Sequence, residues 1–150
     1  MFIRILYYGF RVYCFIFRPV RMGVRMMMIQ DEKIWLIQQT YMAGWFMPGG
    51  GLKKDEALDD AARREAREET GAEVGEVTLV GAYSHFGEWK SDHNIVFLSS
   101  DFKFTGKPDS EIAEVRAFAL NELPADLWPG HRRRIEEYRA GMKNPQFGKW

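Results

Sequence analysis

Short apolar runs separated by turn residues repeat along the chain, and two segments with helical spacing lie among them. The apolar runs predict strands over residues 24–29, 33–39, 77–83, 94–100 and 115–120. The helical segments are residues 55–70 and 132–139, and Gly71 is suited to end the first helix because glycine readily adopts the left-handed conformation. Strands interleaved with helices predict an α/β fold with one sheet covered on both faces.

The N-terminal segment is almost wholly apolar apart from Arg4, Arg11 and Arg18. Residues seven apart share one face of a helix but lie on opposite faces of a strand, so a helix with a basic stripe is expected over residues 1–20, ahead of a domain formed by residues 21–150. An arginine at the centre of a bilayer costs at least ~2.5–3.5 kcal/mol, and no small-residue cleavage site follows, which argues against a membrane span or a signal peptide.

Three alternatives remain for this segment. The helix packs on the domain or on a second subunit, which would give a homodimer, or it lies on a membrane surface through residues 1–18 as a peripheral contact. The third alternative is an N-terminal strand.

Composition limits the kind of protein. A chain of 150 residues with 46% apolar and 28% charged residues is typical of one soluble globular domain. The 21 basic and 21 acidic residues balance, so bulk charge does not indicate a nucleic acid polymer as a partner. Cys14 is the single cysteine and cannot form an intramolecular disulfide, which favours a reducing compartment and a cytoplasmic location.

The first predicted helix carries an unfavourable cluster of acids. Glu65, Glu68 and Glu69 stand at positions i, i+3 and i+4, so their carboxylates share one helix face. Acid–base pairs four residues apart make the first half of the helix an ordinary solvated surface, but Glu65 and Glu69 are a like-charge pair that costs ~0.2–0.5 kcal/mol near a helix C-terminus. Bound Mg²⁺ or Mn²⁺ would reverse the sign of this interaction, because clustered carboxylates are the ligands these ions require.

The acidic segment resembles the Nudix box. Its fixed positions are occupied by Gly50, Glu56, Arg64, Glu65, Glu68, Glu69 and Gly71. Ala66 and Ala72 stand where the family pattern has bulky aliphatic residues, which concerns local packing rather than metal binding. The resemblance covers residues 50–72, with weaker extensions over 45–51 and 111–124, and implies the family's three-layer α/β/α sandwich with a mixed β-sheet.

The resemblance also implies roles for these side chains. The positions of Glu65, Glu68 and Glu69 correspond to the family's magnesium ligands, and that of Arg64 to an arginine that pairs with the glutamate at position 56 to brace loop against helix. The implied activity is a magnesium-dependent pyrophosphohydrolase, in which water attacks a phosphorus of a nucleoside diphosphate linked to another group.

The general base of that reaction is left open between two regions of the chain. Glu65 is one candidate, and Glu111 followed by Glu114 are candidates from a later loop. The alternative for Glu111 and Glu114 is a solvated loop that leads into the strand predicted over 115–120. Catalytic roles are therefore expected for Glu65, Glu68, Arg64 and Glu111.

Two segments outside the helix are candidates for substrate contact. Gly49 and Gly50 would let the backbone approach the helix and position its glutamates, the alternative being a structural tight turn. The arginine triplet 132–134 could meet phosphates, although a solvated helix face explains it better.

Aromatic and histidine side chains give weaker indications. A polar stretch with His85, Trp89 and His93 is expected to form a loop between two strands, and Trp89 and His93 are candidates for substrate binding. Trp89 or Trp128 could stack on a base, with ordinary burial as the alternative for each. For the histidines the alternative is an exposed or satisfied side chain.

The sequence leaves the substrate open. Nucleoside triphosphates are favoured over nucleotide sugars or dinucleoside polyphosphates, and the absence of proline between Pro48 and Pro108 removes the marker that accompanies ADP-ribose hydrolysis in the family. A different class of function is a non-catalytic nucleotide-sensing or interaction module. Such modules usually lose box glutamates, whereas all of them are present here.

Overall fold

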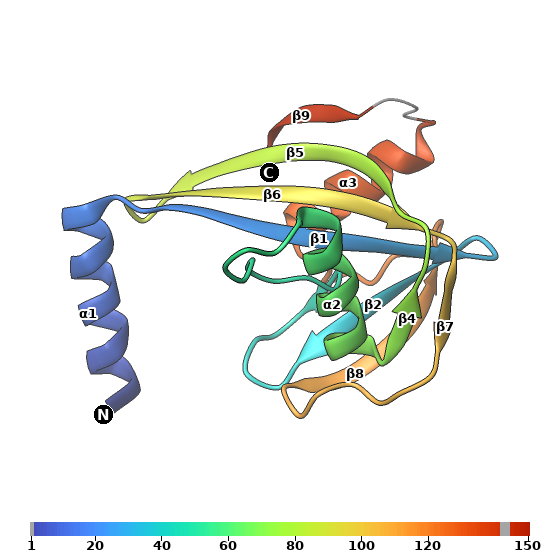
Figure 1. Ribbon diagram of the computed structural model, residues 1–150, viewed down its shortest axis with the longest axis horizontal. Helices are drawn as coiled ribbons and strands as arrows, with labels where there is room; N and C mark the ends of the chain where they lie inside the picture. The colour runs from blue at the N-terminus through green and yellow to red at the C-terminus, as the bar shows by residue number, and fades with distance from the viewer. Residues whose placement is uncertain (1, 142–144) are drawn as a thin grey trace.

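The computed structural model describes residues 2–141 and 145–150, with side chains from residue 8 onward. The elements in chain order are α1 (Phe2–Phe17), β1 (Val20–Gln30), β2 (Lys33–Gln39), β3 (Trp45–Phe46), α2 (Leu58–Thr70), β4 (Ala72–Val74), β5 (Thr78–Gly87), β6 (Lys90–Ser99), β7 (Phe102–Phe104), β8 (Ile112–Ala119), α3 (Pro129–Arg139) and β9 (Gln146–Lys149) (Figure 1).

Seven strands form one mixed sheet in the order β3-β2-β1-β6-β5-β9, with β8 paired to β2 beside this path. The central pair, β1 and β6, is parallel and runs from Val20 opposite Ser91 to Met28 opposite Ser99. The short strands β4 and β7 form a separate antiparallel pair. The mixed sheet of the predicted fold class is confirmed.

Alternate side chains of β1 enter two separate cores, one on each face of the sheet. Met26 and Met28 pack with Ala62 of α2 on one face, whereas Met27 packs with Ile135 of α3 on the other. This alternation follows from the period of two along a strand. The sheet is therefore covered on both faces, as Figure 1 shows, and the α/β/α arrangement is confirmed.

Small residues let α2 lie close to the sheet. Ala61, Ala62 and Ala66 of α2 are fully buried, as is Ala72 at the start of β4. Ala66 and Ala72 thus occupy the packing positions of the box pattern with smaller side chains, and Met26 and Met28 of β1 fill the space opposite them.

The helix α1 projects from one end of the sheet (Figure 1). It meets the domain at the β5–β6 hairpin, where the ring of Phe15 lies 5.4 Å from that of Trp89. Most of its other described side chains are exposed, including Ile16 at 62% and Phe17 at 67%. The helix therefore contacts the domain only through this hairpin among the described residues, and its contact with a second subunit or a membrane stays a prediction.

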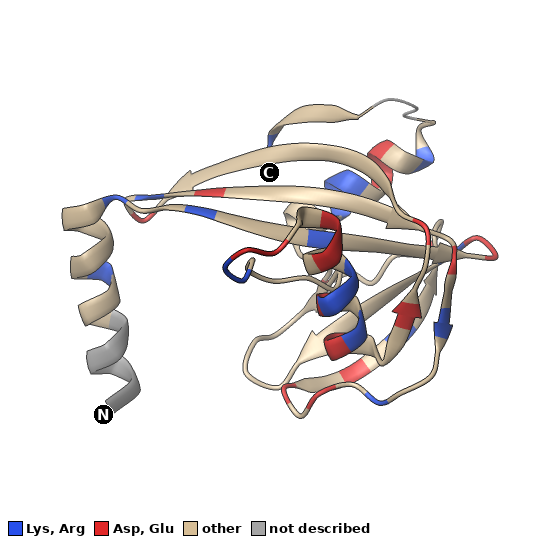
Figure 2. Ribbon diagram, viewed as in Figure 1, with Lys and Arg blue, Asp and Glu red and all other residues tan. Residues whose placement is uncertain are grey.

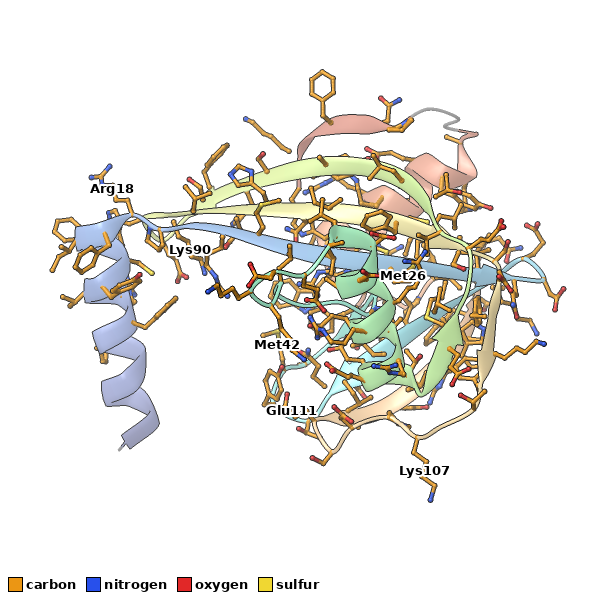
Figure 3. The ribbon with its side chains drawn as sticks, in the orientation of Figure 1. Arg18, Met26, Met42, Lys90, Lys107 and Glu111 are labelled. Atoms are coloured by element: carbon orange, nitrogen blue, oxygen red, sulfur yellow. The ribbon has the colours of Figure 1, made fainter. Side chains whose placement is uncertain are left out.

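The basic stripe is only partly visible. The side chain of Arg4 lies outside the described residues, and Arg18 follows the end of the helix with φ +43°. Arg18 and Lys90 lie near the junction of α1 and the hairpin (Figure 3), where the Lys90 ammonium is 5.9 Å from the ring of Phe10. Among the described residues, no helix has the length and apolarity needed to cross a membrane.

The polar stretch expected as a loop is a β-hairpin, which corrects that prediction. His85 lies on β5 opposite Asp92, and His93 lies on β6 opposite Ser84. The connecting residues Glu88 and Trp89 have φ of +50° and +61°. Such tight turns usually carry Asn or Gly, so a Glu-Trp turn gives no sequence signal for the hairpin.

Candidate active site

The box helix α2 begins later than predicted, at Leu58. Its first turn has no side-chain cap, but Asp59 and Asp60 stabilise it by their charge near the positive end of the helix dipole. At the other end Gly71 adopts a left-handed conformation with φ +74° and donates its N–H to the Arg67 carbonyl, as predicted for a terminating glycine.

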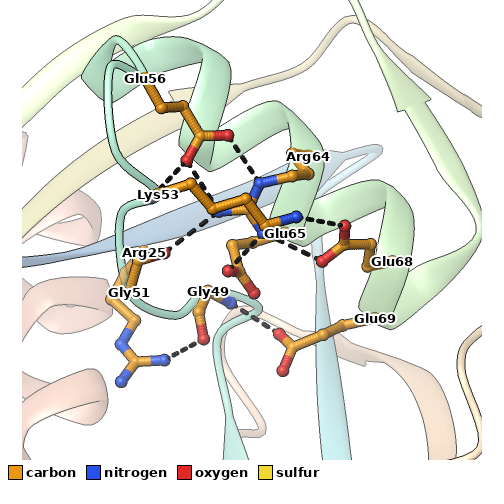
Figure 4. Close-up of polar contacts among 9 residues, drawn as sticks. All are labelled: Arg25, Gly49, Gly51, Lys53, Glu56, Arg64, Glu65, Glu68 and Glu69. Carbon is orange, nitrogen blue, oxygen red and sulfur yellow. Dashed lines mark hydrogen bonds and ion pairs between the residues drawn. The ribbon is translucent and has the colours of Figure 1, made fainter.

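Arg64 connects the preceding loop to this helix. Its Nε lies 2.6 Å from Oε1 of Glu56 and its Nη2 lies 2.9 Å from Oε2, a two-pronged ion pair. Nη2 also donates to the Gly51 carbonyl at 3.1 Å (Figure 4). The hydrogen bonds from Arg64, followed by that from the Lys53 N–H, lower the pKa of Glu56 to about 2. The predicted pairing of Arg64 with Glu56 is confirmed.

The same arginine holds two box carboxylates. Its Nη1 lies 2.7 Å from Oε1 of Glu65 and 3.0 Å from Oε2 of Glu68. The Lys53 ammonium is 3.4 Å from the other oxygen of Glu68. Basic residues are interleaved with the acids along α2 and its loop (Figure 2), and Glu65 and Glu68 are paired with cations of the chain itself.

Glu69 lies in a drier environment than its neighbours. Its Oε2 accepts the Gly49 N–H at 2.7 Å. Burial raises its pKa to about 7, with the negative charge of Glu65 adding to the rise and the hydrogen bond from Gly49 and the charge of Arg25 opposing it. A nearby cation would favour the ionised form that burial disfavours.

The three predicted metal ligands are not assembled as a metal site. Within the described part of the chain, no three His, Cys, Asp or Glu side chains are grouped as they would be around an ion. The residues fit a divalent cation by their chemistry, because Glu65, Glu68 and Glu69 supply hard oxygen donors next to one another and Arg64 already attracts two of them. Their role as ligands stays a prediction.

The glycine loop is compressed between β1 and α2. Gly49 has φ +149°, and a Cβ there would lie 2.1 Å from the Val24 carbonyl oxygen. A Cβ on Gly50 would lie 2.6 Å from Oε2 of Glu65, whereas one on Gly51 would meet nothing within 4 Å. Each of the first two glycines therefore allows a close approach, one to the sheet and one to a box carboxylate.

A cavity of about 540 Å³ opens beside the glycine loop, on the sheet face covered by α3. Its lining includes Arg25, Phe46, Gly50, His93, Asn94 and Trp128. The rings of Phe46 and Trp128 lie 5.3 Å apart and are tilted by 32°, which gives the cavity an apolar aromatic wall. A larger hollow of about 740 Å³, lined by Asp31 and Tyr138 among others, includes no residue of the box.

His131, at the start of α3, lies against the inner wall of this cavity. Its Nδ1 accepts the Met47 N–H at 3.0 Å, which requires the neutral ring with its proton on Nε2. Burial, and then the charge of Arg25, lower the pKa of His131 well below its ordinary value. The residue is a fixed neutral group rather than a proton carrier at neutral pH.

The predicted substrate-binding residues fall in different places. Gly50 and His93 line the cavity, and the Nδ1 of His93 is 2.9 Å from the Ser84 hydroxyl. Gly49 lies behind the cavity wall, where it bonds to Glu69. Trp89 is absent from the cavity lining and packs on α1 instead, which corrects the expectation of a loop side chain open to substrate.

The two later glutamates differ in their surroundings. Glu111 is exposed, its carbonyl accepts the Thr40 N–H at 2.9 Å, and its charge contributes to the raised pKa of Tyr41 after the larger effect of burial. Glu114 lies within β8 and is hydrogen-bonded to Arg116 at 2.7 Å, so it does not sit in the loop that was expected. Glu111 remains a candidate base, and Glu114 is engaged elsewhere.

The arginine triplet does not form one solvated face. Arg134 is 4% exposed, lies 3.8 Å from the centre of the Tyr83 ring and pairs with Glu137. Arg132 donates to the Pro124 carbonyl. Arg133 alone of the three lines the cavity.

Comparison with known proteins agrees with this architecture. The NUDIX domain model matches residues 19–138. A putative 8-oxo-dGTP diphosphatase from Bacillus subtilis is 24% identical over 115 residues, which are 77% of this chain and 76% of that protein. An ADP-ribose pyrophosphatase from Methanocaldococcus jannaschii is 31% identical over 114 residues, 73% of this chain and 67% of that protein.

Solved structures show the same fold. The crystal structure of a MutT NUDIX hydrolase from Burkholderia pseudomallei superposes with a TM-score of 0.71 at 25% identity, and the match covers 78% of this chain and 96% of that chain. The chain belongs to the Nudix family of hydrolases.

Proposed function

We propose that the protein is a metal-dependent pyrophosphohydrolase that cleaves a nucleoside diphosphate linked to another group, with a nucleoside triphosphate as the favoured substrate. One observation carries the proposal: the glycine loop borders a cavity of about 540 Å³ with an aromatic wall, and the same loop contacts the box carboxylates Glu65 and Glu69. The cavity is large enough for a nucleoside. Relatives named as an 8-oxo-dGTP diphosphatase and as an oxidized purine nucleoside triphosphate hydrolase support the choice of substrate class.

In this proposal the chain holds both the metal and the substrate. Glu65, Glu68 and Glu69 would hold Mg²⁺ or Mn²⁺, which when bound supplies charge neutralisation at phosphate oxygens and activates water. Arg64 keeps its two-pronged bond to Glu56 and thereby fixes the start of α2 against the loop. Phe46 and Trp128 offer ring faces to a base.

The general base is proposed to be Glu65 or Glu111. Glu65 is close to the glycine loop and would act from the helix, whereas Glu111 would act from the segment that precedes β8. Comparing pH–rate profiles of Glu65→Gln and Glu111→Gln tests the choice, since loss of the base removes the acidic limb of the profile.

A substrate panel tests the activity itself. Purified protein with magnesium should release phosphate or pyrophosphate from at least one nucleoside triphosphate, nucleotide sugar or dinucleoside polyphosphate, and Glu68→Gln should abolish the release. Asp60→Asn, an exposed substitution on the same helix, is the matched control and should leave turnover unchanged. No turnover on any diphosphate compound would favour the non-catalytic nucleotide-sensing module.

A separate proposal concerns α1, which we infer to lie on an anionic membrane surface. Its described side chains are largely apolar and aromatic, with Tyr8, Val12 and Ile16 all more than half exposed. The chain has no acidic residue before Asp31, so the helix itself carries only positive side-chain charges. Protein lacking residues 2–17 should lose flotation with anionic vesicles. A change in sedimentation without any change in flotation would instead identify a homodimer.

A further inference from the structure

Arg25 is a charged residue in the middle of an apolar strand. It lies on β1 between Val24 and Met26, which are both fully buried. Strand alternation turns its side chain to the face covered by α3, where it lines the cavity together with Phe46 and His131. Burying a charge is costly unless it is paired, so its position calls for a compensating partner.

The chain satisfies this guanidinium only in part. Its Nη1 donates to the Gly49 carbonyl (Figure 4). Its Nε is shielded from solvent and has no hydrogen-bond partner among the described residues. Burial lowers the pKa of Arg25, and the charges of Glu69 and Glu65 oppose this effect. Among the ion pairs of the described residues, however, none joins Arg25 to either carboxylate.

The location of Arg25 connects the two halves of the proposed site. Gly49, whose carbonyl accepts from Arg25, donates its own N–H to Glu69 at 2.7 Å. The guanidinium is therefore linked to a box carboxylate through a single residue, Gly49, and Arg25 also forms part of the cavity lining. A nucleotide with its base in the cavity and its diphosphate at the carboxylates would pass beside it.

We infer that Arg25 is a substrate-binding residue, whose guanidinium donates hydrogen bonds to the diphosphate group from the cavity side. The inference rests on the proposed function. A planar guanidinium matches the geometry of phosphate oxygens and stays charged when partly buried, which a lysine ammonium does less well. The competing explanation is structural: Arg25 would only hold the glycine loop through Gly49 and balance the nearby acids.

The test compares Arg25→Gln with Arg21→Gln. Arg21 lies four residues earlier on β1 and also lines the cavity, but its side chain is 55% exposed and 4.0 Å from Asp92. Both substitutions remove one positive charge from the same cavity. Their difference therefore reports direct contact rather than general electrostatics.

The readout is calorimetric titration with inorganic pyrophosphate in the presence of magnesium. Arg25→Gln should weaken binding about 10- to 150-fold, the factor that corresponds to the loss of one charge-assisted hydrogen bond. Arg21→Gln should weaken it at most about fivefold, as expected for a screened surface charge. The kcat/KM for a substrate found in the panel should fall by similar factors.

Three results would overturn the inference. If Arg25→Gln binds pyrophosphate as Arg21→Gln does while melting at a lower temperature, Arg25 has only a structural role. If Arg25→Gln does not fold, Arg25→Lys replaces it, and unchanged pyrophosphate binding in that variant would refute contact through the planar guanidinium. Wild-type protein that neither hydrolyses a diphosphate nor binds pyrophosphate would overturn the proposed function as well.

Discussion

Replacing glycines 49, 50 and 51 by alanine, one at a time, should separate the part of the loop that maintains the fold from the part that positions a carboxylate. The three residues are adjacent but meet different neighbours: the Val24 carbonyl, the Glu65 carboxylate, and open space. We expect a loss of stability at the first position, a loss of activity at the second and no effect at the third.

The cost at Gly49 can be worked from its geometry. An alanine at φ +149° costs about 1–3 kcal/mol. Its Cβ would also lie 2.1 Å from the Val24 oxygen, far inside the 3.4 Å of ordinary contact, so the loop must withdraw from β1. Withdrawal weakens the hydrogen bonds from Val24 N to Gly50 O at 2.9 Å and from Met26 N to Pro48 O at 2.8 Å.

Each of these hydrogen bonds contributes about 0.5–1.5 kcal/mol, so the total loss in the free energy of unfolding is about 2–6 kcal/mol. For a protein of this size that corresponds to a fall in Tm of about 4–24 °C. Gly50→Ala is different, because its Cβ meets the end of a flexible side chain, Glu65, at 2.6–2.7 Å. Turning that side chain aside costs about 0.5–1.5 kcal/mol, but a displacement of about 1 Å can reduce turnover about 100-fold.

Thermal unfolding followed by circular dichroism, together with kcat/KM on the panel substrate, would check all three variants. Gly51→Ala is the matched control and should be indistinguishable from wild type in both measurements. Gly49→Ala as stable as Gly51→Ala would refute the close packing of loop on strand. A fully active Gly50→Ala would show that the position of Glu65 beside the loop has no bearing on catalysis.

Other substitutions test the surroundings of the site. His131 must stay neutral to accept the Met47 N–H, and burial lowers its pKa in the folded state. The free energy of unfolding should therefore fall by up to about 1.4 kcal/mol for each pH unit below about pH 6.5. Urea unfolding of His131→Asn should lack this dependence. At Gly71 φ is +74° and an added Cβ would lie 2.6 Å from backbone atoms of Gly106, so Gly71→Ala should lower the free energy of unfolding by about 1–3 kcal/mol in the same assay. The control Gly106→Ala, whose Cβ would have its nearest contact at 3.6 Å, should be as stable as wild type. Since the pKa of Glu56 is lowered to about 2, its contribution to stability should vanish as pH falls from about 4.5 to 2, and Glu56→Gln should melt lower at pH 7 with a smaller acid-induced decrease.

The box could be predicted from sequence because helical geometry converts its spacing directly into positions. Glu65, Glu68 and Glu69 lie within about one turn, so any helix over those residues places them on one face, although their carboxylates are not grouped as they would be around an ion. The pairing of Arg64 with Glu56 followed from the family resemblance, and the structure has it at 2.6 Å.

The cavity could not be predicted in the same way. Arg25, Asn94 and His131 come from β1, β6 and α3, and no spacing along the chain relates them. Their proximity depends on the parallel pairing of β1 with β6, which tertiary packing decides. One signal was available: an arginine within a run of strand residues otherwise as apolar as Met26–Ile29 is expensive to bury and so suggests a function.

The β5–β6 hairpin and the position of the N-terminal helix could not be predicted from the sequence either. Residues 90–94 are all polar, so this part of the β5–β6 hairpin lacks the alternation of apolar and polar residues that indicates a strand. Backbone pairing continues the sheet there, together with cross-strand contacts such as that of Phe86 with His93. That extension is what separates α1 from the domain, because the helix is attached at the far end of strands that run past the core (Figure 1). The spacing of the arginines could indicate a helix. It could not indicate that the strands next to this helix extend beyond the core and place it at a distance from the rest of the domain.

Charge balance explains why the site needs both a brace and a second arginine. Arg64 neutralises Glu65 and Glu68 through Nη1 while its Nε and Nη2 are fixed on Glu56, so Nη1 can release the carboxylates without the helix losing its attachment to the loop. Glu69 has no such partner and is instead buried near Arg25, with the Gly49 N–H donating to Glu69 and the Gly49 carbonyl accepting from Arg25. The two halves of the acidic cluster are therefore controlled by different cations. One belongs to the helix itself, whereas the other stands at the wall of the cavity where a phosphate would enter.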